Sequence, residues 1–374
     1  MEVPGINSCA KITTSHPPCC LRIFRDNFLL VGTYDLNKST GHRTGSIDVY
    51  DRELTSIGSY STYGAILDLK LSPHLDTLVA TGHSTGNLTL WRILVTADGI
   101  ELEEICNIQI FDPDVLVSSL HFSPNNCESI LVTGTSGESK VVNVLREGVT
   151  FSLNAVTDHY DSVDSSTYKV QGKDTFAVED TTPALTSGHS LECWTGEFGY
   201  LHPLQNVVFT GGDDSVLQAH DLRTANVIWS NGRIHGAGVV AIKSSTETFR
   251  ANKPTSILTG SYDDNMRDLD LRMLGDEIYP GVNVPPAGKR EKCLGGGVWR
   301  FAESPRNLID PSANELLVCC MYNGAKVVRV YDDEIQEIRN MKKGHESMCY
   351  GGDWGKRFAA TCSFYDCSLQ LWDI

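Results

Sequence analysis

The chain has 374 residues, and its 31 Lys and Arg residues against 47 Asp and Glu give a formal net charge of −16. This length exceeds one ordinary compact domain and suits two or three small domains or a single repetitive fold. The negative charge disfavours binding to nucleic acid or to an anionic membrane surface, because both depend on Lys and Arg. We therefore expect a partner or substrate that is locally cationic.

The 33 glycines and 14 prolines indicate many turns, and hence many short strands. Neither a signal peptide nor a membrane-spanning helix is expected, since the chain has no suitable apolar run. The 12 cysteines are scattered without a C-x-x-C pair, so we expect no zinc site or other metal site. The sequence thus favours a cytoplasmic protein whose thiols are reduced.

One pattern recurs along the chain: an apolar strand that ends in a small residue, a polar turn, and an alternating strand that often ends in an aromatic residue and Asp. Its first strands occupy residues 29–32, 78–82, 131–134, 208–211, 257–260, 317–320 and 359–362. A blade of a WD-repeat propeller takes about 40–45 residues, and the spacing here is similar or longer. The pattern predicts an all-β, seven-bladed WD-repeat β-propeller over residues 1–374.

Ring closure and two inserts follow from the spacing. The sequence stops at Ile374, directly after the third strand of a unit, so residues 9–13 are expected to supply the fourth strand and close the ring. The longest intervals predict an acidic loop insert at 158–186, between blades three and four, and another loop insert at 275–292, between blades five and six. Loops of this length are often functional, although a merely mobile surface loop is the alternative.

A possible nucleophile occurs in Gly82-His83-Ser84-Thr85-Gly86, which matches the G-x-S-x-G elbow of serine hydrolases. That elbow requires a strand before the serine and a helix after it. Here a strand is predicted after the turn, as in the other repeats. We therefore expect Ser84 to be an ordinary turn residue.

Three histidines open predicted blades, and each is followed by an Asp in the turn of the same blade. The pairs are His189 with Asp214, His235 with Asp263, and His345 with Asp366. In repeats of this kind such groups form a buried hydrogen-bond network, which favours a structural role. A His and Asp pair can also orient a general base, so His235 remains a candidate catalytic residue.

The innermost strands of blades four to seven begin with unusual residues that should face the central channel. An aromatic cage with carboxylates is what recognition of a quaternary ammonium group requires. Packing of the tryptophans between blades is the alternative. The candidate catalytic residues are Glu192, Asp353, His235 and Arg300. The candidate substrate-binding residues are Trp194, Trp299, Tyr350, Trp354, Gly296 and Gly297.

These segments resemble the WD-repeat diphthine methylesterases, a family also called diphthine methyltransferases. The most specific matches, in this order, are Glu192-Cys193-Trp194, Gly296-Gly297-Val298-Trp299-Arg300 and Tyr350-Gly351-Gly352-Asp353-Trp354. Gly211-Gly212-Asp213-Asp214 and Gly260-Ser261-Tyr262-Asp263 also match but occur in many WD repeats. The resemblance is clear over residues 186–374 and weak before them. His220-Asp221 and Leu269-Asp270 replace the usual Trp-Asp, which affects packing rather than chemistry.

The resemblance implies a carboxylesterase, without a cofactor, that hydrolyses the methyl ester of methylated diphthine on translation elongation factor 2, before the final amidation of diphthamide biosynthesis. Elongation factor 2 is then the partner, with other enzymes of the pathway as further candidates. The resemblance assigns no catalytic residue. We expect a rim carboxylate or histidine to activate water, with Arg300, the indole N–H groups or the backbone N–H groups of Gly296 and Gly297 stabilising the oxyanion. The alternative is a non-catalytic WD-repeat scaffold for protein complexes.

Overall fold

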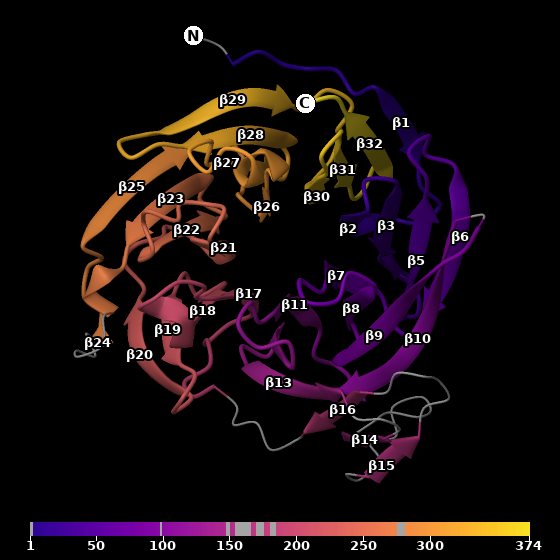
Figure 1. Cartoon of the computed structure of the whole chain (residues 1–374), viewed down its shortest axis with the longest axis horizontal. Coiled ribbons are helices and arrows are strands. Elements are labelled where there is room, and N and C mark those ends of the chain that lie inside the picture. The colour runs from indigo at the N-terminus through magenta and orange to yellow at the C-terminus, as the bar shows by residue number, and fades with distance from the viewer. Residues whose placement is uncertain are drawn as a thin grey trace.

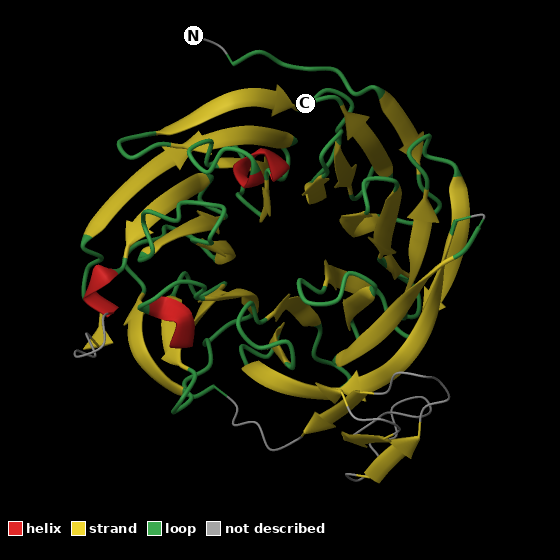
Figure 2. Ribbon diagram, in the orientation of Figure 1, coloured by secondary structure: helices red, strands yellow, loops and turns green. Residues whose placement is uncertain are grey.

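The computed structural model describes residues 3–97, 99–146, 150–153, 166–169, 176–179, 185–274 and 281–374. Within these residues, seven antiparallel sheets stand around a central channel, and each forms one blade (Figure 1). Strands dominate and the few helices are short, as Figure 2 shows. The predicted all-β, seven-bladed propeller is therefore confirmed.

The blades follow the chain in order, each running outward from an inner strand. Blade one contains β2 (Pro18–Phe24), β3 (Phe28–Thr33), β5 (Arg43–Tyr50) and β6 (Ser56–Thr62), with the short β4 (Asp35–Leu36) beside β5. Blade two contains β7 (Ile66–Leu71), β8 (Leu78–His83), β9 (Asn87–Val95) and β10 (Ile100–Gln109). Blade three contains β11 (Val117–Phe122), β12 (Ser129–Gly134), β13 (Ser139–Arg146) and β16 (Phe176–Glu179).

The next two blades also contact each other through a short strand, which lies between two strands of blade five in the chain and pairs with blade four. Blade four contains β17 (Cys193–Phe198), β18 (Val207–Gly212), β19 (Leu217–Asp221) and β20 (Asn226–Asn231), and β24 (Gly281–Val282) pairs with β20 in parallel. Blade five contains β21 (Val239–Ser244), β22 (Ser256–Ser261), β23 (Asn265–Asp270) and β25 (Gly288–Cys293). The 3-10 helices of this region are η1 (Leu204–Asn206) and η2 (Arg272–Leu274).

The last two blades bring the chain back to its start. Blade six contains β26 (Arg300–Glu303), β27 (Glu315–Cys319), β28 (Ala325–Val330) and β29 (Ile335–Met341), with helix η3 (Pro305–Leu308) after β26. Blade seven contains β30 (Cys349–Trp354), β31 (Ala359–Ser363), β32 (Ser368–Trp372) and β1 (Ala10–Thr13). Strand β1 pairs with β32 from Ala10 opposite Leu371 to Thr13 opposite Ser368, which confirms the predicted closing strand.

Both predicted inserts contain an outer strand, and to that extent the loop predictions are wrong. In the range 158–186, β16 is the fourth strand of blade three, and β15 (Ser166–Lys169) pairs with β14 (Thr150–Leu153). In the range 275–292, β25 is the fourth strand of blade five and pairs with all of β23. Residues 154–165, 170–175, 180–184 and 275–280 lie outside the described residues.

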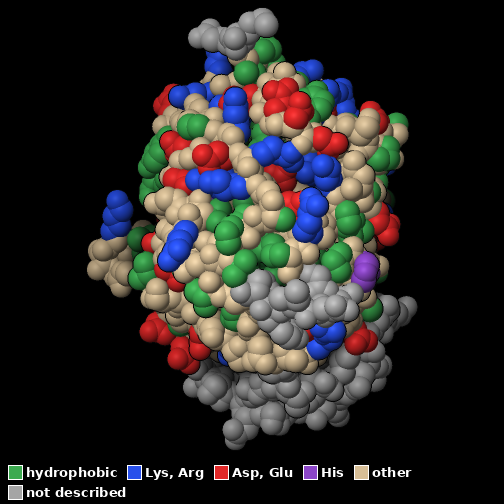
Figure 3. Space-filling model, turned by 90° about the vertical axis from the view of Figure 1, so that its left-hand side faces the viewer, with side chains coloured by type: hydrophobic (Ala, Val, Ile, Leu, Met, Phe, Trp, Pro, Cys, Tyr) green, Lys and Arg blue, Asp and Glu red, His purple; other side chains and the backbone are tan. Residues whose placement is uncertain are grey.

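The sequence of β25, Gly-Lys-Arg-Glu-Lys-Cys, lacks the apolar alternation of a half-buried strand because its side chains face solvent. Ion pairs hold it to β23 instead: Arg267 Nε lies 3.2 Å from Glu291 Oε2, and Arg290 pairs with Asp268. Figure 3 shows this side of the propeller, where cationic and anionic side chains are interspersed. A strand with this composition reads as a polar loop when only its sequence is considered.

The core lies between neighbouring blades, which explains the apolar alternation of the middle strands. Between blades two and three, for example, Leu88 and Leu90 pack with Leu120 and Ile130. Trp229 and Trp372 are fully buried. The described residues include no helix that is long and apolar enough to cross a bilayer.

Candidate functional site

The inner strands share one irregularity that sets their side chains in register. In β2, β7, β11, β17, β21 and β30 the pairing with the next strand shifts directly after the first residue. Residues that lie the same number of positions after these first residues are therefore structurally equivalent. Those that face the channel do so at similar heights. In blade six, Trp299 directly precedes β26, and its backbone N–H donates to Cys319 O at 2.9 Å.

Aromatic rings from four blades meet at one end of the channel. Trp194 and Tyr350 are the second residues of β17 and β30, Trp299 occupies the corresponding place in blade six, and Tyr262 follows β22. The ring centroid of Trp299 lies 6.0 Å from that of Trp194, 5.9 Å from that of Tyr262 and 5.0 Å from that of Tyr350. We call these four residues the aromatic cluster. It joins Trp194, Trp299 and Tyr350 as the sequence predicted, and adds Tyr262.

The two indole N–H groups of the aromatic cluster differ in their bonding. Trp194 Nε1 donates to Asp213 Oδ1 at 3.1 Å. Trp299 Nε1 is buried and has no hydrogen-bond partner among the described residues. A buried donor without a partner is costly to a fold, so a bound group that accepts from it gains a favourable hydrogen bond. Trp299 thus offers both a ring face and an N–H group to a bound molecule.

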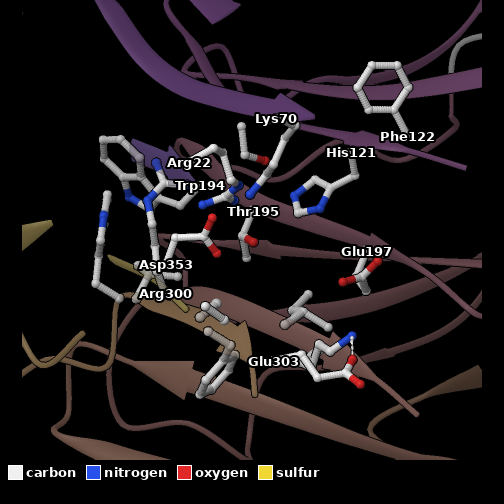
Figure 4. A pocket seen from close by; sticks show the side chains of 18 of the residues that line it. Arg22, Lys70, His121, Phe122, Trp194, Thr195, Glu197, Arg300, Glu303 and Asp353 are labelled. Carbon is white, nitrogen blue, oxygen red and sulfur yellow. Dashed lines mark ion pairs between the residues drawn. The ribbon is translucent and has the colours of Figure 1, made fainter. Parts of the chain in front are cut away.

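A cavity of about 280 Å³ adjoins the aromatic cluster and follows the channel. Of the residues predicted from the sequence, Trp194, Trp299, Arg300 and Asp353 line it. Figure 4 shows that Arg22, Lys70, His121, Glu197 and Asp353 come from different inner strands and surround the same space.

Arg300 spans the channel and joins blade six to blade two. Its Nη1 donates to Asp68 Oδ1 at 2.6 Å, and its Nη2 donates to Leu67 O at 2.8 Å. Asp68 is fully buried, lies 3.5 Å from Lys70 Nζ, and also accepts from the backbone N–H of Leu120 at 3.1 Å. Burial by itself would raise the pKa of Asp68, but Arg300 and Lys70 outweigh it and hold that pKa well below its usual value.

The fifth residue of the inner strand is ionisable in six of the seven blades. These residues, which we call the ionisable ring, are Arg22, Lys70, His121, Glu197, Lys243 and Asp353. All six line the cavity. The ring mixes four nitrogen groups with two carboxylates, so it can bind an anion, hold a proton and release one within a small volume.

Burial changes the protonation of several members of the ionisable ring. It lowers the pKa of Lys70 to about 8, with Arg22 acting in the same direction. It also lowers the pKa of His121 well below its usual value, again assisted by Lys70. Burial raises the pKa of Glu197 to about 7, although Lys243 and Lys70 oppose this shift. These shifts favour an uncharged imidazole at His121 and a protonated carboxyl at Glu197.

Five of the six members of the ring have partners among the described residues, including Lys70, which lies 3.5 Å from Asp68, and Glu197, whose Oε1 accepts from Phe198 N at 3.0 Å. Asp353 Oδ2 accepts from the backbone N–H of Ile23 in blade one at 2.8 Å. Lys243 Nζ lies 3.2 Å from Glu303 Oε2. By contrast, His121 Nε2 is buried and has no hydrogen-bond partner among the described residues.

Trp354 is placed elsewhere. It is the neighbour of Asp353 on β30, and successive side chains of a strand point to opposite faces. Its ring is buried in the core between blades six and seven, with Leu317, Cys319 and Trp372. This is the packing role that the sequence left open, so we do not propose Trp354 as a substrate-binding residue.

His235 lies in the hydrogen-bond network of blade five and does not line the cavity. Its Nε2 lies 2.8 Å from Thr259 Oγ1, as Nε2 of His345 lies 2.7 Å from Thr361 Oγ1 in blade seven. Burial lowers the pKa of His235 to about 3. Ser84 Oγ accepts from the backbone N–H of Ala65 at 3.0 Å, within the turn region of blade two.

The remaining predicted residues lie near the aromatic cluster but outside the cavity lining. Glu192 is half-buried, and its backbone oxygen accepts from Asp213 N at 2.8 Å. A side chain at Gly297 would lie 2.7 Å from Met321 Sδ, and one at Gly296 would collide with Cys320 O. Both glycines therefore allow the loop of blade six to pack closely.

Sequence reasoning missed Asp68 and most of the ionisable ring. The signal was present, because Leu69-Lys70-Leu71 and Leu120-His121-Phe122 each place one ionisable residue between apolar ones. One such residue in a strand is ordinary, and only its recurrence at the same position of successive blades is informative. Among the described residues, no group of three or more His, Cys, Asp or Glu is arranged to hold a metal ion.

Comparison with known proteins identifies close relatives. The chain is 54% identical over 375 aligned residues to the diphthine methyltransferase of Saccharomyces cerevisiae, covering 97% of each chain. It is 32% identical to the diphthine methyltransferase of Schizosaccharomyces pombe, covering 94% of this chain and 92% of that one. No protein-family model matches the chain.

A similar solved structure comes from the crystal structure of the mitotic checkpoint complex. Its TM-score is 0.65 at 13% identity, with 98% of this chain and 91% of that chain covered. At this identity the likeness supports the propeller fold alone.

Proposed function

Because the chain belongs to the diphthine methyltransferase family, we propose that it acts in diphthamide biosynthesis as a carboxylesterase. Its substrate is methylated diphthine on translation elongation factor 2, and the reaction hydrolyses the methyl ester to a carboxylate and methanol. The freed carboxylate is then available for amidation. We place this reaction in the cytoplasm, where elongation factor 2 works.

The aromatic cluster is the observation that carries this proposal. The diphthine side chain ends in a trimethylammonium group, and such a cation binds best against several aromatic faces. Three rings lie within 6.0 Å of the Trp299 ring, measured between centroids. Burial is the main cause that raises the pKa of Tyr262, and the nearby carboxylates of Asp213 and Glu192 raise it further, so the potential at the cluster is also negative.

The ester belongs to the same side chain as the ammonium group, so it reaches the adjoining cavity when the ammonium group is bound. The unpartnered Nε1 of Trp299 can donate to the ester carbonyl, and this hydrogen bond strengthens as the oxyanion forms. We assign Arg300 to positioning, because its two terminal nitrogens already bind Asp68 and Leu67. Asp353 is a better candidate than Glu192 for contact with the ester, since it lines the cavity.

Docking of a large substrate is favoured by the surface around the cluster. Leu191 and Tyr322 are exposed by 51% and 65%, and Tyr365 by 69%. All three belong to segments next to the aromatic cluster: Leu191 precedes β17, Tyr322 follows β27 and Tyr365 follows β31. The same surface would also serve a scaffold without catalysis, so activity must be measured directly.

The test is to incubate the purified protein with elongation factor 2 carrying methylated diphthine and to follow the modified peptide by mass spectrometry. We expect the loss of one methyl group with release of methanol. The Trp299→Ala variant should bind this substrate more weakly by roughly 0.5–2 kcal/mol, the value of one cation–π contact. If the folded wild-type protein leaves the substrate unchanged, the non-catalytic scaffold is favoured instead.

A further inference from the structure

The proposed role of the aromatic cluster leaves the neighbouring ionisable ring without a function. We propose that His121 is the general base of the site, which takes a proton from the water that attacks the ester, while Arg22 and Lys70 stabilise the resulting oxyanion. This inference rests on the proposed esterase function and specifies the groups that carry out the chemistry.

The position of His121 suits a base that acts on bound water. It is the fifth residue of β11, lines the cavity, and projects into the space shared with Lys70 and Thr195 (Figure 4). Its Nε2 is shielded from solvent and has no hydrogen-bond partner among the described residues. In the tautomer that carries its proton on Nδ1, this nitrogen accepts a hydrogen bond from a cavity water once a small rotation of the ring brings it to the cavity surface.

The charges around His121 keep it neutral before the reaction and favour its protonation during it. Lys70 and Asp68 face it from β7, Arg300 from β26 and Arg22 from β2, while Glu197 lies on the neighbouring β17. With the substrate uncharged at its ester, burial and the nearby cations disfavour the imidazolium. An oxyanion offsets these cations, so the proton affinity of His121 rises as negative charge develops.

Arg22 is suited to receive that negative charge. Its Nη1 donates to Leu21 O at 2.8 Å. No ion pair of Arg22 occurs within the described part of the chain, whereas Arg300 and Lys70 pair with Asp68 and Lys243 pairs with Glu303. Arg22 is thus the cavity cation with the most capacity for a new anionic partner, first the oxyanion and then the product carboxylate.

The proposed reaction balances without a cofactor. The oxygen of water forms a bond to the ester carbon as one of its protons passes to His121, and the carbonyl electron pair moves to oxygen. The tetrahedral intermediate then re-forms the carbonyl and breaks the bond to the methoxy oxygen, which receives the proton from His121 and leaves as methanol. The acid that remains gives up its proton to solvent and is held as a carboxylate by Arg22.

The test compares His121→Asn with wild type in single-turnover hydrolysis of methylated elongation factor 2. His42→Asn is the matched control, since His42 is exposed and is not among the residues that line the cavity. We expect His121→Asn to lower the hydrolysis rate by about 10²–10⁴-fold, the usual contribution of a general base, with little change in substrate affinity. His42→Asn should hydrolyse at the wild-type rate.

A second variant separates catalysis from folding. Imidazole added to His121→Gly should restore part of the activity, which it would not do if His121 only supported the structure. Near wild-type activity in His121→Asn, an equal loss in His42→Asn, or a large loss confined to Glu197→Gln would overturn the assignment of the base. Failure of the wild-type protein itself to hydrolyse the ester would instead overturn the proposed function.

Discussion

Replacing Arg300 by Met should destabilise the propeller through Asp68, which is fully buried. Asp68 would lose the 2.6 Å hydrogen bond from Arg300 and keep Lys70 at 3.5 Å and the backbone N–H of Leu120. Removing one partner of a buried pair typically costs 3–5 kcal/mol, because it leaves a buried charge. Since Lys70 remains, we expect the lower end, about 3 kcal/mol at pH 7.

The assay is equilibrium unfolding in urea, followed by tryptophan fluorescence, for both single variants and the double variant. Asp68→Asn should cost a similar amount, and the double variant should cost at least about 1 kcal/mol less than the two single costs combined. The pKa of Asp68 is lowered in the folded state. The contribution of the pair is therefore present above the ordinary carboxyl pKa and lost as the pH falls through the folded-state value. Purely additive costs, or an Arg300→Met cost below about 1 kcal/mol, would refute this reasoning.

Three further predictions concern folding and protonation. Deleting residues 1–14 should lower the melting temperature markedly, because β1 covers the edge of β32, and an unchanged melting temperature would disprove that this strand matters for closure. The pKa of Glu197 rises from 4.5 to about 7 on folding. Wild type should therefore lose roughly 3 kcal/mol of unfolding free energy relative to Glu197→Gln as the pH rises from 4.5 to 7. Equal pH dependence of the two unfolding free energies, measured in urea, would contradict this. His235→Ala should lower stability by about 1–3 kcal/mol through its lost bond to Thr259, and a variant of wild-type stability that has lost hydrolysis would restore His235 as a catalytic candidate.

The ring of blades was predictable from the sequence because each blade repeats the same burial. A strand such as residues 78–82 is buried on both faces between its neighbours, so it consists mainly of apolar and small residues. The same pattern recurs once in each blade. The outer strand β25 escaped prediction because its side chains face solvent and ion pairs replace apolar contacts. Periodicity therefore identifies inner and middle strands better than outer ones.

The aromatic part of the site was also predictable, since Trp194, Trp299 and Tyr350 begin equivalent strands. Trp354 was grouped with them wrongly, as one step along a strand moves a side chain to the opposite face. Asp68 and His121 were missed because their significance lies in which strands meet across the channel. That information appears only when the blades are aligned on the register shift that follows the first residue of each inner strand.

Hydrolysis of methylated elongation factor 2 in water labelled with heavy oxygen tests the central claim most directly. The account predicts that methanol is released unlabelled and that one labelled oxygen enters the freed carboxylate of diphthine, because water attacks the ester carbon. Label in the methanol would mean attack at the methyl group instead. A substrate that gains a methyl group, or that loses none, would contradict the assignment of this propeller as an esterase.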